Sequence, residues 1–161
     1  MTEINIRDAV LSDLGRLSEI WYEAWHDAHD RIVPPDLVTL RTRASFETRL
    51  RAALPDVRVA TLADAARGFY VLRGAELYQL FVSASARGTG LAARLIADAE
   101  RRLTQNEVGC AWLSCAIGNS RAARFYEKCG WSRTGVITEH VEVPNGTFAL
   151  EVWRYEKQLS Q

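Results

Sequence analysis

The sequence predicts an α/β protein of the α+β type, with a mixed, mostly antiparallel sheet of about seven strands and helices on both of its faces. The first observation is a central segment in which apolar stretches at 76–82 and 111–117 flank an amphipathic stretch at 89–104. This order is a βαβ unit, whose right-handed crossover makes the two strands parallel. The second observation is that hairpin patterns precede and follow the unit. Because hairpins add antiparallel strands, the sheet is expected to contain one parallel pair.

The N-terminal third predicts one strand and two helices. Ile4 and Ile6 alternate with polar residues, as in a short strand. Ser12 is placed to cap a helix whose apolar face carries Leu14, Leu17, Trp21, Ala24 and Ala28. Pro34-Pro35 then interrupts the chain, and a second helix is expected over 36–53. Its arginines are expected to point mostly outward: Arg41, Arg43, Arg49 and Arg51.

The later elements follow from hydrophobic period and turn residues. The stretches 57–62 and 68–72 have the pattern of a hairpin. The helix at 89–104 repeats an apolar residue every four positions, at Leu91, Leu95, Ala99 and Leu103. Asn119 is placed to cap a further helix that ends at Gly130. Pro144-Asn145-Gly146 is a typical turn between two final strands.

The composition is that of one globular domain spanning residues 1–161. The 20 lysines and arginines balance 20 aspartates and glutamates, and a net charge of zero argues against a general nucleic-acid binder. Three cysteines without a Cys-x-x-Cys pair favour a reduced, cytoplasmic setting over a disulfide framework. The N-terminus lacks the segments of a signal peptide, and no stretch approaches the ~18 apolar residues of a membrane span. We therefore expect neither a membrane nor a nucleic acid as a partner.

The most informative motif is the stretch Arg87-Gly88-Thr89-Gly90-Leu91-Ala92, which lies between the strand at 76–82 and the helix that follows. Small residues allow a ligand to approach the backbone closely. The first N–H groups of a helix have no partner inside it, and the helix dipole adds about half a positive charge at that end. Arg87 adds a formal charge beside them. The motif therefore predicts a binding site for phosphate groups.

Two alternatives compete with this interpretation. Residues 88–93 also fit Gly-x-Gly-x-x-Ala, a fingerprint of dinucleotide-binding folds. Four residues, 83–86, separate this pattern from the strand, although the fingerprint needs a tight turn directly after it. The next strand ends at Ile117-Gly118-Asn119, without the acidic residue that would hold a ribose. The other alternative is a flexible loop that precedes a helix.

A second motif, Asn-x-x-Ala-x-x-Phe-Tyr-x-x-x-Gly-Trp, runs from Asn119 to Trp131. Together with Arg-x-x-Gly-x-Ala at 87–92, it resembles the GNAT superfamily of N-acetyltransferases. The resemblance is close from residue 76 to residue 135, and the order of elements extends it more loosely to the rest of the chain. It implies a GNAT-like acyl-CoA N-acyltransferase fold. It also implies direct transfer of an acetyl group from acetyl-CoA to an amine of a small molecule or a peptide.

The resemblance also implies where acetyl-CoA binds. In the family, the two parallel strands splay apart and the pantetheine arm lies between them. Backbone groups of Leu80, Phe81 and Val82 are then expected to pair with the arm. The pyrophosphate is expected beside Arg87, on the backbone N–H groups of Gly88, Thr89, Gly90, Leu91 and Ala92. Asn119 matches a family position that contacts the cofactor, and its sequence context fits a plain helix cap equally well.

Two residues are candidates for acid–base catalysis. Tyr126 matches the family tyrosine that protonates the departing CoA sulfur, and its alternative role is that of a packing aromatic. A phenol with a pKa near 10 protonates a thiolate whose thiol has a pKa near 8.5 with little driving force, so its position matters most. Glu76, at the start of its strand, is the candidate base for the amine proton, or alternatively a carboxylate in solvent. A strand N–H near Phe81 or Val82 is expected to stabilise the thioester oxygen.

The acceptor side is less specific. In the family the first helices line the acceptor pocket, which makes Trp25, His26 and His29 candidate substrate-binding residues, although helical spacing also fits Trp25 in the core. Glu76, with Glu139 and Glu142, favours a cationic amine. No third ligand accompanies the two histidines, so no metal is expected. The alternative function is a non-catalytic acyl-CoA-binding sensor or assembly module, and a monomer and a homodimer both stay open.

Overall fold

The computed structural model describes residues 3–159, whose strands form one sheet in the order β1-β2-β3-β4-β5-β7-β6. Every neighbouring pair is antiparallel except β4 and β5, which are parallel. This arrangement confirms the predicted fold class. The strands are β1 Ile4–Asp8, β2 Val57–Leu62, β3 Ala65–Arg73, β4 Glu76–Val82, β5 Cys110–Ala116, β6 Ser132–Val143 and β7 Gly146–Gln158.

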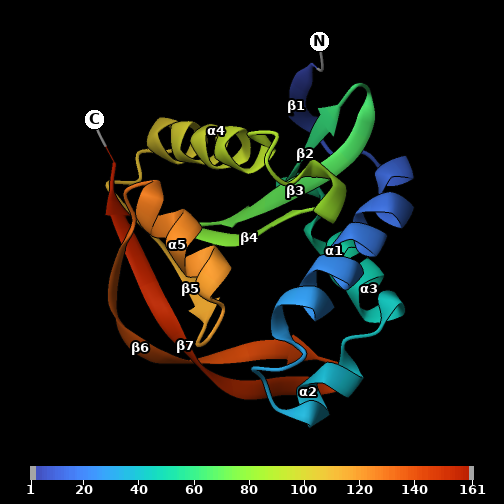
Figure 1. Cartoon of the computed structure of the whole chain (residues 1–161), viewed down its shortest axis with the longest axis vertical. Coiled ribbons are helices and arrows are strands. Elements are labelled where there is room, and N and C mark those ends of the chain that lie inside the picture. Colours follow the sequence, from blue (N-terminus) through green and yellow to red (C-terminus); the bar gives the residue numbers. More distant parts are fainter. Residues whose placement is uncertain (1–2, 160–161) are drawn as a thin grey trace.

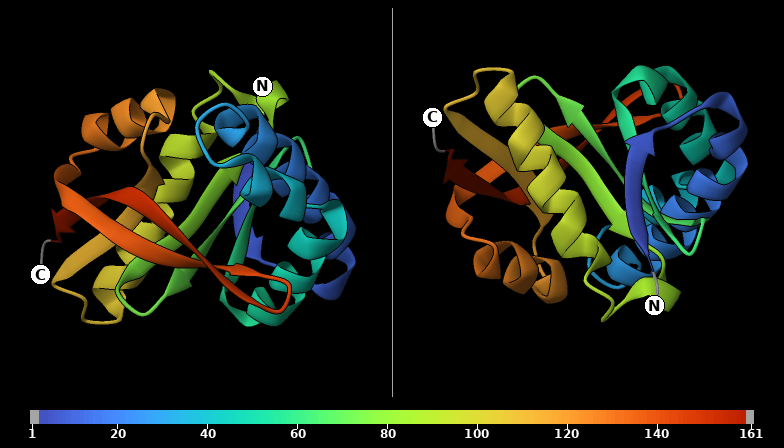
Figure 2. Two further views of the ribbon diagram at one scale, coloured as in Figure 1. Left: turned by 90° about the horizontal axis from the view of Figure 1, so that it is seen from below. Right: turned by 90° about the horizontal axis from the view of Figure 1, so that it is seen from above.

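Helices cover both faces of the sheet (Figures 1 and 2). The helices are α1 Leu14–His29, α2 Pro35–Leu40, α3 Arg43–Ala53, α4 Leu91–Gln105 and α5 Ser120–Lys128. One buried cluster joins α4 and α5 to the sheet, and a second joins α1, α2 and α3 to the opposite face. In Figure 1 the long β6–β7 hairpin extends from beneath α5 to α2, so it spans the side of the sheet where β4 and β5 separate.

The parallel strands β4 and β5 are in register at one position only, Glu76 opposite Trp112. One further backbone bond supports this end of the pair, from the Trp112 N–H to the carbonyl of Ala75 at 3.1 Å. Beyond it the two strands diverge. Antiparallel neighbours hold the outer edges of β4 and β5, but their inner edges lack a strand partner from Leu77 onward. The divergence therefore leaves a wedge-shaped opening inside the sheet, bordered by peptide groups.

A β-bulge at Tyr78 changes which side chains of β4 face each layer. Val71 of β3 is opposite Gln79, and its neighbour Leu72 is opposite Leu77, so Tyr78 is the extra residue. As a result Leu77 and Leu80, three positions apart, both pack against the α4 cluster, while Tyr78 packs on the α1 face. Bulges redirect side chains in this way and are frequent next to functional sites.

Two details of the N-terminal third differ from the sequence-based expectation. Ser12 does not cap α1, because it lies within a 3₁₀ turn at Leu11–Asp13. The Asp13 carboxylate instead accepts a hydrogen bond from the Val10 N–H at 2.8 Å and two from the Arg7 guanidinium at 2.8 and 2.9 Å. The single helix expected over 36–53 is two helices, because α2 ends at Leu40 and α3 starts at Arg43, capped by the Thr42 hydroxyl, which accepts the Ser45 N–H.

Asp98 of α4 is a buried carboxylate that ties this helix to the sheet. It accepts hydrogen bonds from the Tyr70 hydroxyl at 2.6 Å, from Arg58 Nε at 3.3 Å and from Arg101. Burial raises the pKa of Asp98, but these hydrogen bonds outweigh it and bring the pKa below its ordinary value. Its contribution to stability is therefore complete above the unfolded pKa near 3.9 and is lost as the pH falls through the lower folded pKa.

Replacing Asp98 by alanine is expected to lower the free energy of unfolding at pH 7 by about 3 kcal/mol, because Arg58 and the Tyr70 hydroxyl lose their buried acceptor. Asp8→Ala is the matched control, since Asp8 pairs with the same Arg58 at 3.0 Å but its side chain is 77% exposed. Its loss should be about 0.5 kcal/mol or less. Urea denaturation of both variants measures the difference, and equal losses would contradict a structural role for Asp98.

Candidate active site

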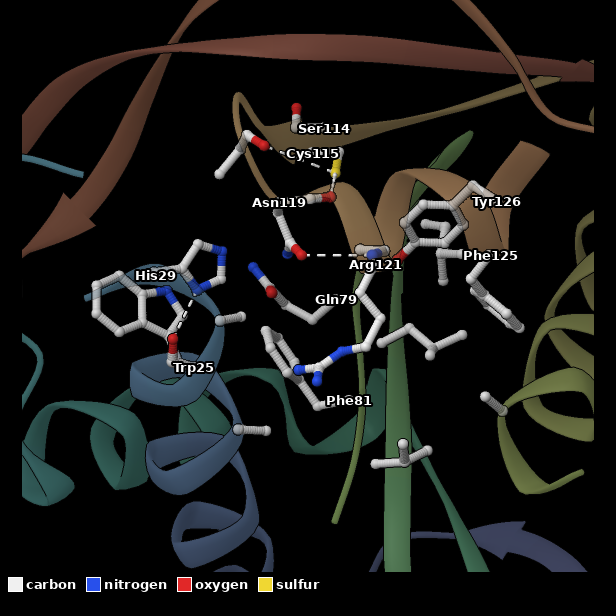
Figure 3. A pocket seen from close by; sticks show the side chains of 18 of the residues that line it. Trp25, His29, Gln79, Phe81, Ser114, Cys115, Asn119, Arg121, Phe125 and Tyr126 are labelled. Carbon is white, nitrogen blue, oxygen red and sulfur yellow. Dashed lines mark hydrogen bonds between the residues drawn. The ribbon is translucent and has the colours of Figure 1, made fainter. Parts of the chain in front are cut away.

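A cavity of about 640 Å³ fills the wedge between β4 and β5. Its walls come from α1 and α2, from β4, from the loop before α4, from β5 and from α5, with residues of the β6–β7 hairpin closing one side. Figure 3 shows the middle of this cavity, with Gln79 and Phe81 of β4 between Trp25 and His29 on one side and Phe125 and Tyr126 on the other. The cavity therefore joins the start of α4 to the space beside α1 and α2.

Most of the residues predicted from the sequence lie on the cavity wall. They are Trp25, His29, Leu80, Phe81, Val82, Arg87, Gly88, Gly90, Leu91, Ala92, Asn119 and Tyr126. Three others do not line it: Glu76, Thr89 and His26. Thr89 is exposed at the start of α4, and its hydroxyl is used locally, donating to the Ala86 carbonyl and accepting the Leu91 N–H.

The loop before α4 presents unpaired backbone donors to the cavity. Gly88 and Gly90 have φ angles of +77° and +87°, a region that side chains disfavour, so glycine is required for this turn. Within residues 3–159, the N–H groups of Gly88, Gly90, Ala92 and Ala93 have no acceptor. A Cβ placed at Gly88 or Gly90 would meet no atom within 4 Å, so the space beside both residues is open. The start of α4 therefore offers an anion site made of peptide groups.

Two arginines flank this site and share one carboxylate. Arg87 from the loop and Arg121 from α5 both donate to Asp27 Oδ2 of α1, at 2.7 and 3.0 Å. Hydrogen bonds from Arg121 and Arg87 hold the pKa of Asp27 below its ordinary value. Asp27 thus joins α1 to the two elements on either side of the anion site, and all three side chains are partly exposed.

Tyr126 and Asn119 lie at the end of the cavity that α5 forms. The Tyr126 side chain is 8% exposed, and its hydroxyl has no hydrogen-bond partner within the described chain. Burial raises the pKa of Tyr126 above its ordinary value, so the phenol is protonated throughout the neutral range. The Asn119 side chain accepts the Ala122 N–H at 3.3 Å, which confirms its role as the helix cap. Its position on the wall also leaves it next to any ligand in the cavity.

The α1 side of the cavity carries a neutral histidine. His29 Nδ1 lies 2.8 Å from the Trp25 carbonyl, which only accepts, so Nδ1 carries the proton and Nε2 has a free lone pair. Burial lowers the pKa of His29 to about 4. Its ring stacks on that of Trp25, at 4.7 Å between centroids. His26 contributes differently, because its two ring nitrogens lie 2.6 Å from Asp30 Oδ1 and from the Arg41 carbonyl oxygen.

Glu76 is buried just behind the cavity wall. It is 6% exposed, and no hydrogen bond from another residue of the described chain reaches its carboxyl group. Burial, followed by repulsion from Glu139, raises the pKa of Glu76 to about 7. Glu139 itself lines the cavity and accepts a hydrogen bond from Ser114 of β5. A carboxyl group that changes protonation state near pH 7 is well matched to proton transfer.

Several wall residues were not anticipated from the sequence: Arg41, Gln79, Ser114 and Arg121. Arg41 was expected on the surface and is instead 3% exposed. It lies in the link between α2 and α3, where the helix is interrupted and the side chain turns inward. No sequence signal distinguishes it from the other arginines nearby. Glu142, expected to attract a cation, does not line the cavity; its carboxylate is bound by Arg73 and by the Tyr78 hydroxyl, both at 3.1 Å.

Within residues 3–159, no group of three or more histidine, cysteine, aspartate or glutamate side chains is arranged to hold a metal ion. Nor is any helix there long and apolar enough to cross a membrane. The three cysteines are unpaired thiols.

The model of the Acetyltransferase (GNAT) family matches residues 17–131, and the chain belongs to this family. The match extends from α1 to the end of the Asn119–Trp131 motif, so it includes the anion site and Tyr126. A comparison with curated proteins finds no match.

Solved structures share the fold over nearly the whole chain. A GCN5-related N-acetyltransferase from Rhodopseudomonas palustris is 19% identical, with a TM-score of 0.76 over 96% of this chain and 95% of its own. PaiA N-acetyltransferase from Thermoplasma acidophilum, solved with coenzyme A, is 19% identical, with a TM-score of 0.66 over 97% and 99% of the two chains. YncA from Salmonella typhimurium, solved with its cofactor acetyl-CoA, is 19% identical, with a TM-score of 0.66 over 99% and 95%.

Proposed function

We propose that the chain is a single-domain N-acetyltransferase that moves an acetyl group from acetyl-CoA directly to an amine. The observation that carries the proposal is the continuity of the cavity, which runs from the unpaired N–H groups at the start of α4, past Tyr126, to the pocket beside α1 and α2. A cofactor with a pyrophosphate at one end and a thioester at the other fits such a path. The co-substrate is acetyl-CoA.

The pyrophosphate would bind the N–H groups of Gly88, Gly90 and Ala92. Arg87 and Arg121 would add positive charge from both sides. To do so they would leave their ion pairs with Asp27 and bind the pyrophosphate instead. The pantetheine arm would pair with the inner edge of β4 at Leu80 to Val82, as an added strand would. With these contacts the thioester would lie near Phe81 and Tyr126.

Acetyl transfer forms a bond between the amine nitrogen and the thioester carbon and breaks the carbon–sulfur bond. A backbone N–H of β4 near Phe81 or Val82 would stabilise the oxygen as it gains negative charge. Tyr126 would donate its phenolic proton to the departing thiolate. Because burial raises the pKa of Tyr126, this proton transfer is uphill, so it requires the hydroxyl to lie within hydrogen-bond distance of the sulfur while the carbon–sulfur bond breaks.

The base is proposed to be Glu76. Its pKa of about 7 lets it accept a proton from a protonated amine far better than His29, whose pKa is about 4. His29 has the better position, since it lies on the wall with a free Nε2. Because Glu76 lies behind the wall, its proton would arrive through a water molecule near Glu139 and Ser114. In this scheme His29 accepts a hydrogen bond from the amine and orients it.

The pH dependence of kcat/KM separates these two bases. If Glu76 is the base, the rate should rise with pH up to about 7, where Glu76 becomes deprotonated. Glu76→Gln keeps the shape and removes the proton acceptor, so this acidic limb should vanish or move to the pKa of the amine. His29→Gln should lower the rate and keep the limb near pH 7. A limb near pH 4 that His29→Gln removes would assign the base to His29.

The function itself is tested by turnover of acetyl-CoA with a panel of primary amines, followed by mass spectrometry of the products. Calorimetry with acetyl-CoA is measured on the same preparation. Binding together with an N-acetylated product supports the proposal. Binding without a product from any amine would favour the alternative, a sensor or assembly module that binds acyl-CoA.

A further inference from the structure

Arg41 is a buried cation on the cavity wall without a carboxylate partner. Its side chain is 3% exposed, and its Nη1 donates to the backbone carbonyl of Glu142. Its Nε is buried and has no acceptor among the described residues. Within residues 3–159, no carboxylate oxygen lies within 4.0 Å of its guanidinium group. Arg41 therefore faces the cavity with hydrogen-bond capacity that the described chain leaves unused.

The surroundings of Arg41 do not supply the missing negative charge. The guanidinium groups of Arg41, Arg49 and Arg73 lie near the Tyr78 hydroxyl. One carboxylate, that of Glu142, lies among them. That carboxylate is bound by Arg73 at 3.1 Å, and Arg49 donates to the Tyr78 oxygen at 3.0 Å. The Nε of Arg49 is also buried and has no acceptor in the described part of the chain. The cluster thus holds two more positive charges than negative ones.

Arg73 and Glu142 are exposed, but Arg41 is buried and Arg49 is partly buried, so the positive charge of these two groups is unfavourable without an anion. Burial, followed by repulsion from Arg49, lowers the pKa of Arg41 to about 10, so the guanidinium is still charged at neutral pH. The fold nevertheless fixes it in place. His26 holds the Arg41 carbonyl oxygen at 2.6 Å, and the guanidinium lies 5.8 Å from the centre of the Trp25 ring. Such a group is prepared to receive an anion, which would restore charge balance.

We infer that the acceptor is an amine that also carries a carboxylate, as in an amino acid, and that Arg41 binds this carboxylate. A guanidinium group matches a carboxylate in shape and binds it through two parallel hydrogen bonds. The opposite charge is present in the same cavity, because Glu139 lines it and would attract the ammonium group. Trp25 and Leu37 make the wall next to Arg41 apolar, which strengthens a charged contact there. The inference rests on the proposed function and narrows its amine to this class.

The test compares matched acceptors in the acetyl-CoA turnover assay. Each amino acid is measured beside its carboxamide and beside the amine that lacks the carboxyl group, with α- and ω-amino acids in separate arms. We expect kcat/KM to favour the carboxylate form by about a hundredfold, since losing one partner of a buried charged pair has effects of this size. Equal turnover of the three forms would overturn the inference and leave the acetyltransferase function standing.

Two variants assign the preference to Arg41. Arg41→Met should remove it, so that amino acid and carboxamide react within about threefold of each other. Arg41→Lys keeps the charge without the two-pronged geometry and should keep part of the preference. Arg43→Met is the control, because Arg43 is the first residue of α3 and its side chain is 55% exposed. A preference that survives in Arg41→Met would place the carboxylate elsewhere.

A binding measurement tests the site without turnover. N-acetyl-amino acids, the expected products, are titrated by calorimetry into the wild type, Arg41→Met, Arg41→Lys and Arg43→Met. Binding that is lost in Arg41→Met and kept in Arg43→Met supports the inference, even if no amine in the panel is acetylated. Absence of binding to the folded wild type, together with turnover of amines that lack a carboxylate, would contradict it.

Discussion

Tyr126→Phe is expected to lower kcat by about ten- to a thousandfold while the Kd for acetyl-CoA stays nearly constant. The change removes one hydroxyl group and keeps the ring. Because that hydroxyl has no partner within the described chain, its loss breaks no internal hydrogen bond. The phenyl ring still fills its place beside Phe125 and Trp131. A fall in kcat alone would therefore report the proton that Tyr126 gives to the departing sulfur.

Tyr155→Phe is the control for this experiment. Its ring lies 6.2 Å from that of Tyr126, but Tyr155 does not line the cavity. Its hydroxyl donates to Glu127 at 2.6 Å and accepts from Arg133, so this variant should lose about 1 kcal/mol of stability and keep its kcat. An unchanged kcat in Tyr126→Phe would reduce Tyr126 to a packing residue.

Gly90→Val is expected to weaken acetyl-CoA binding by about a hundredfold or more in calorimetry, since the N–H groups around Gly90 would no longer converge on one anion. The φ angle of Gly90 is +87°, and a side chain in this region costs about 1–2 kcal/mol. Valine must therefore either strain the turn or move it. In both cases its side chain enters open space that the pyrophosphate would occupy.

Gly74→Val separates strain from loss of the site. Gly74 also has a positive φ angle, +60°, and open space around its Cβ position, but it lies in the β3–β4 turn and does not line the cavity. Both variants should lose similar stability in thermal denaturation. Only Gly90→Val should lose affinity for acetyl-CoA, and an unchanged affinity in that variant would remove the pyrophosphate from this loop.

The fold could be predicted from the sequence because its signals are local. The period of α4, the Asn119 cap and the Asn145-Gly146 turn each depend on a few adjacent residues, and the structure has all three. The interruption between α2 and α3 was missed because the hydrophobic pattern continues across it. Only one side-chain cap, the Thr42 hydroxyl, marks the start of α3. The start of α1 was missed because Asp13, one residue after Ser12, binds the Val10 N–H instead.

In the candidate site, too, residues within local motifs were predicted and residues placed by tertiary packing were not. Residues of the two motifs, such as Gly90 and Tyr126, lie on the cavity wall, where their roles stay predictions. The acceptor side depends on tertiary packing. His26 and His29 lie one helical turn apart, yet only His29 faces the cavity. Arg41 and Glu139 come from distant parts of the chain and meet there only because the β6–β7 hairpin reaches α2.

The single register position between β4 and β5 has a consequence for hydrogen exchange. Alternate amides along the inner edges of both strands have no strand partner within residues 3–159, so they should exchange quickly although they belong to the centre of the sheet. Peptide-like groups of a bound cofactor would pair with some of them and slow their exchange. The same protection would raise the thermal midpoint as ligand concentration increases. Hydrogen exchange of the β4 and β5 amides would therefore report cofactor binding residue by residue, without an assay of turnover.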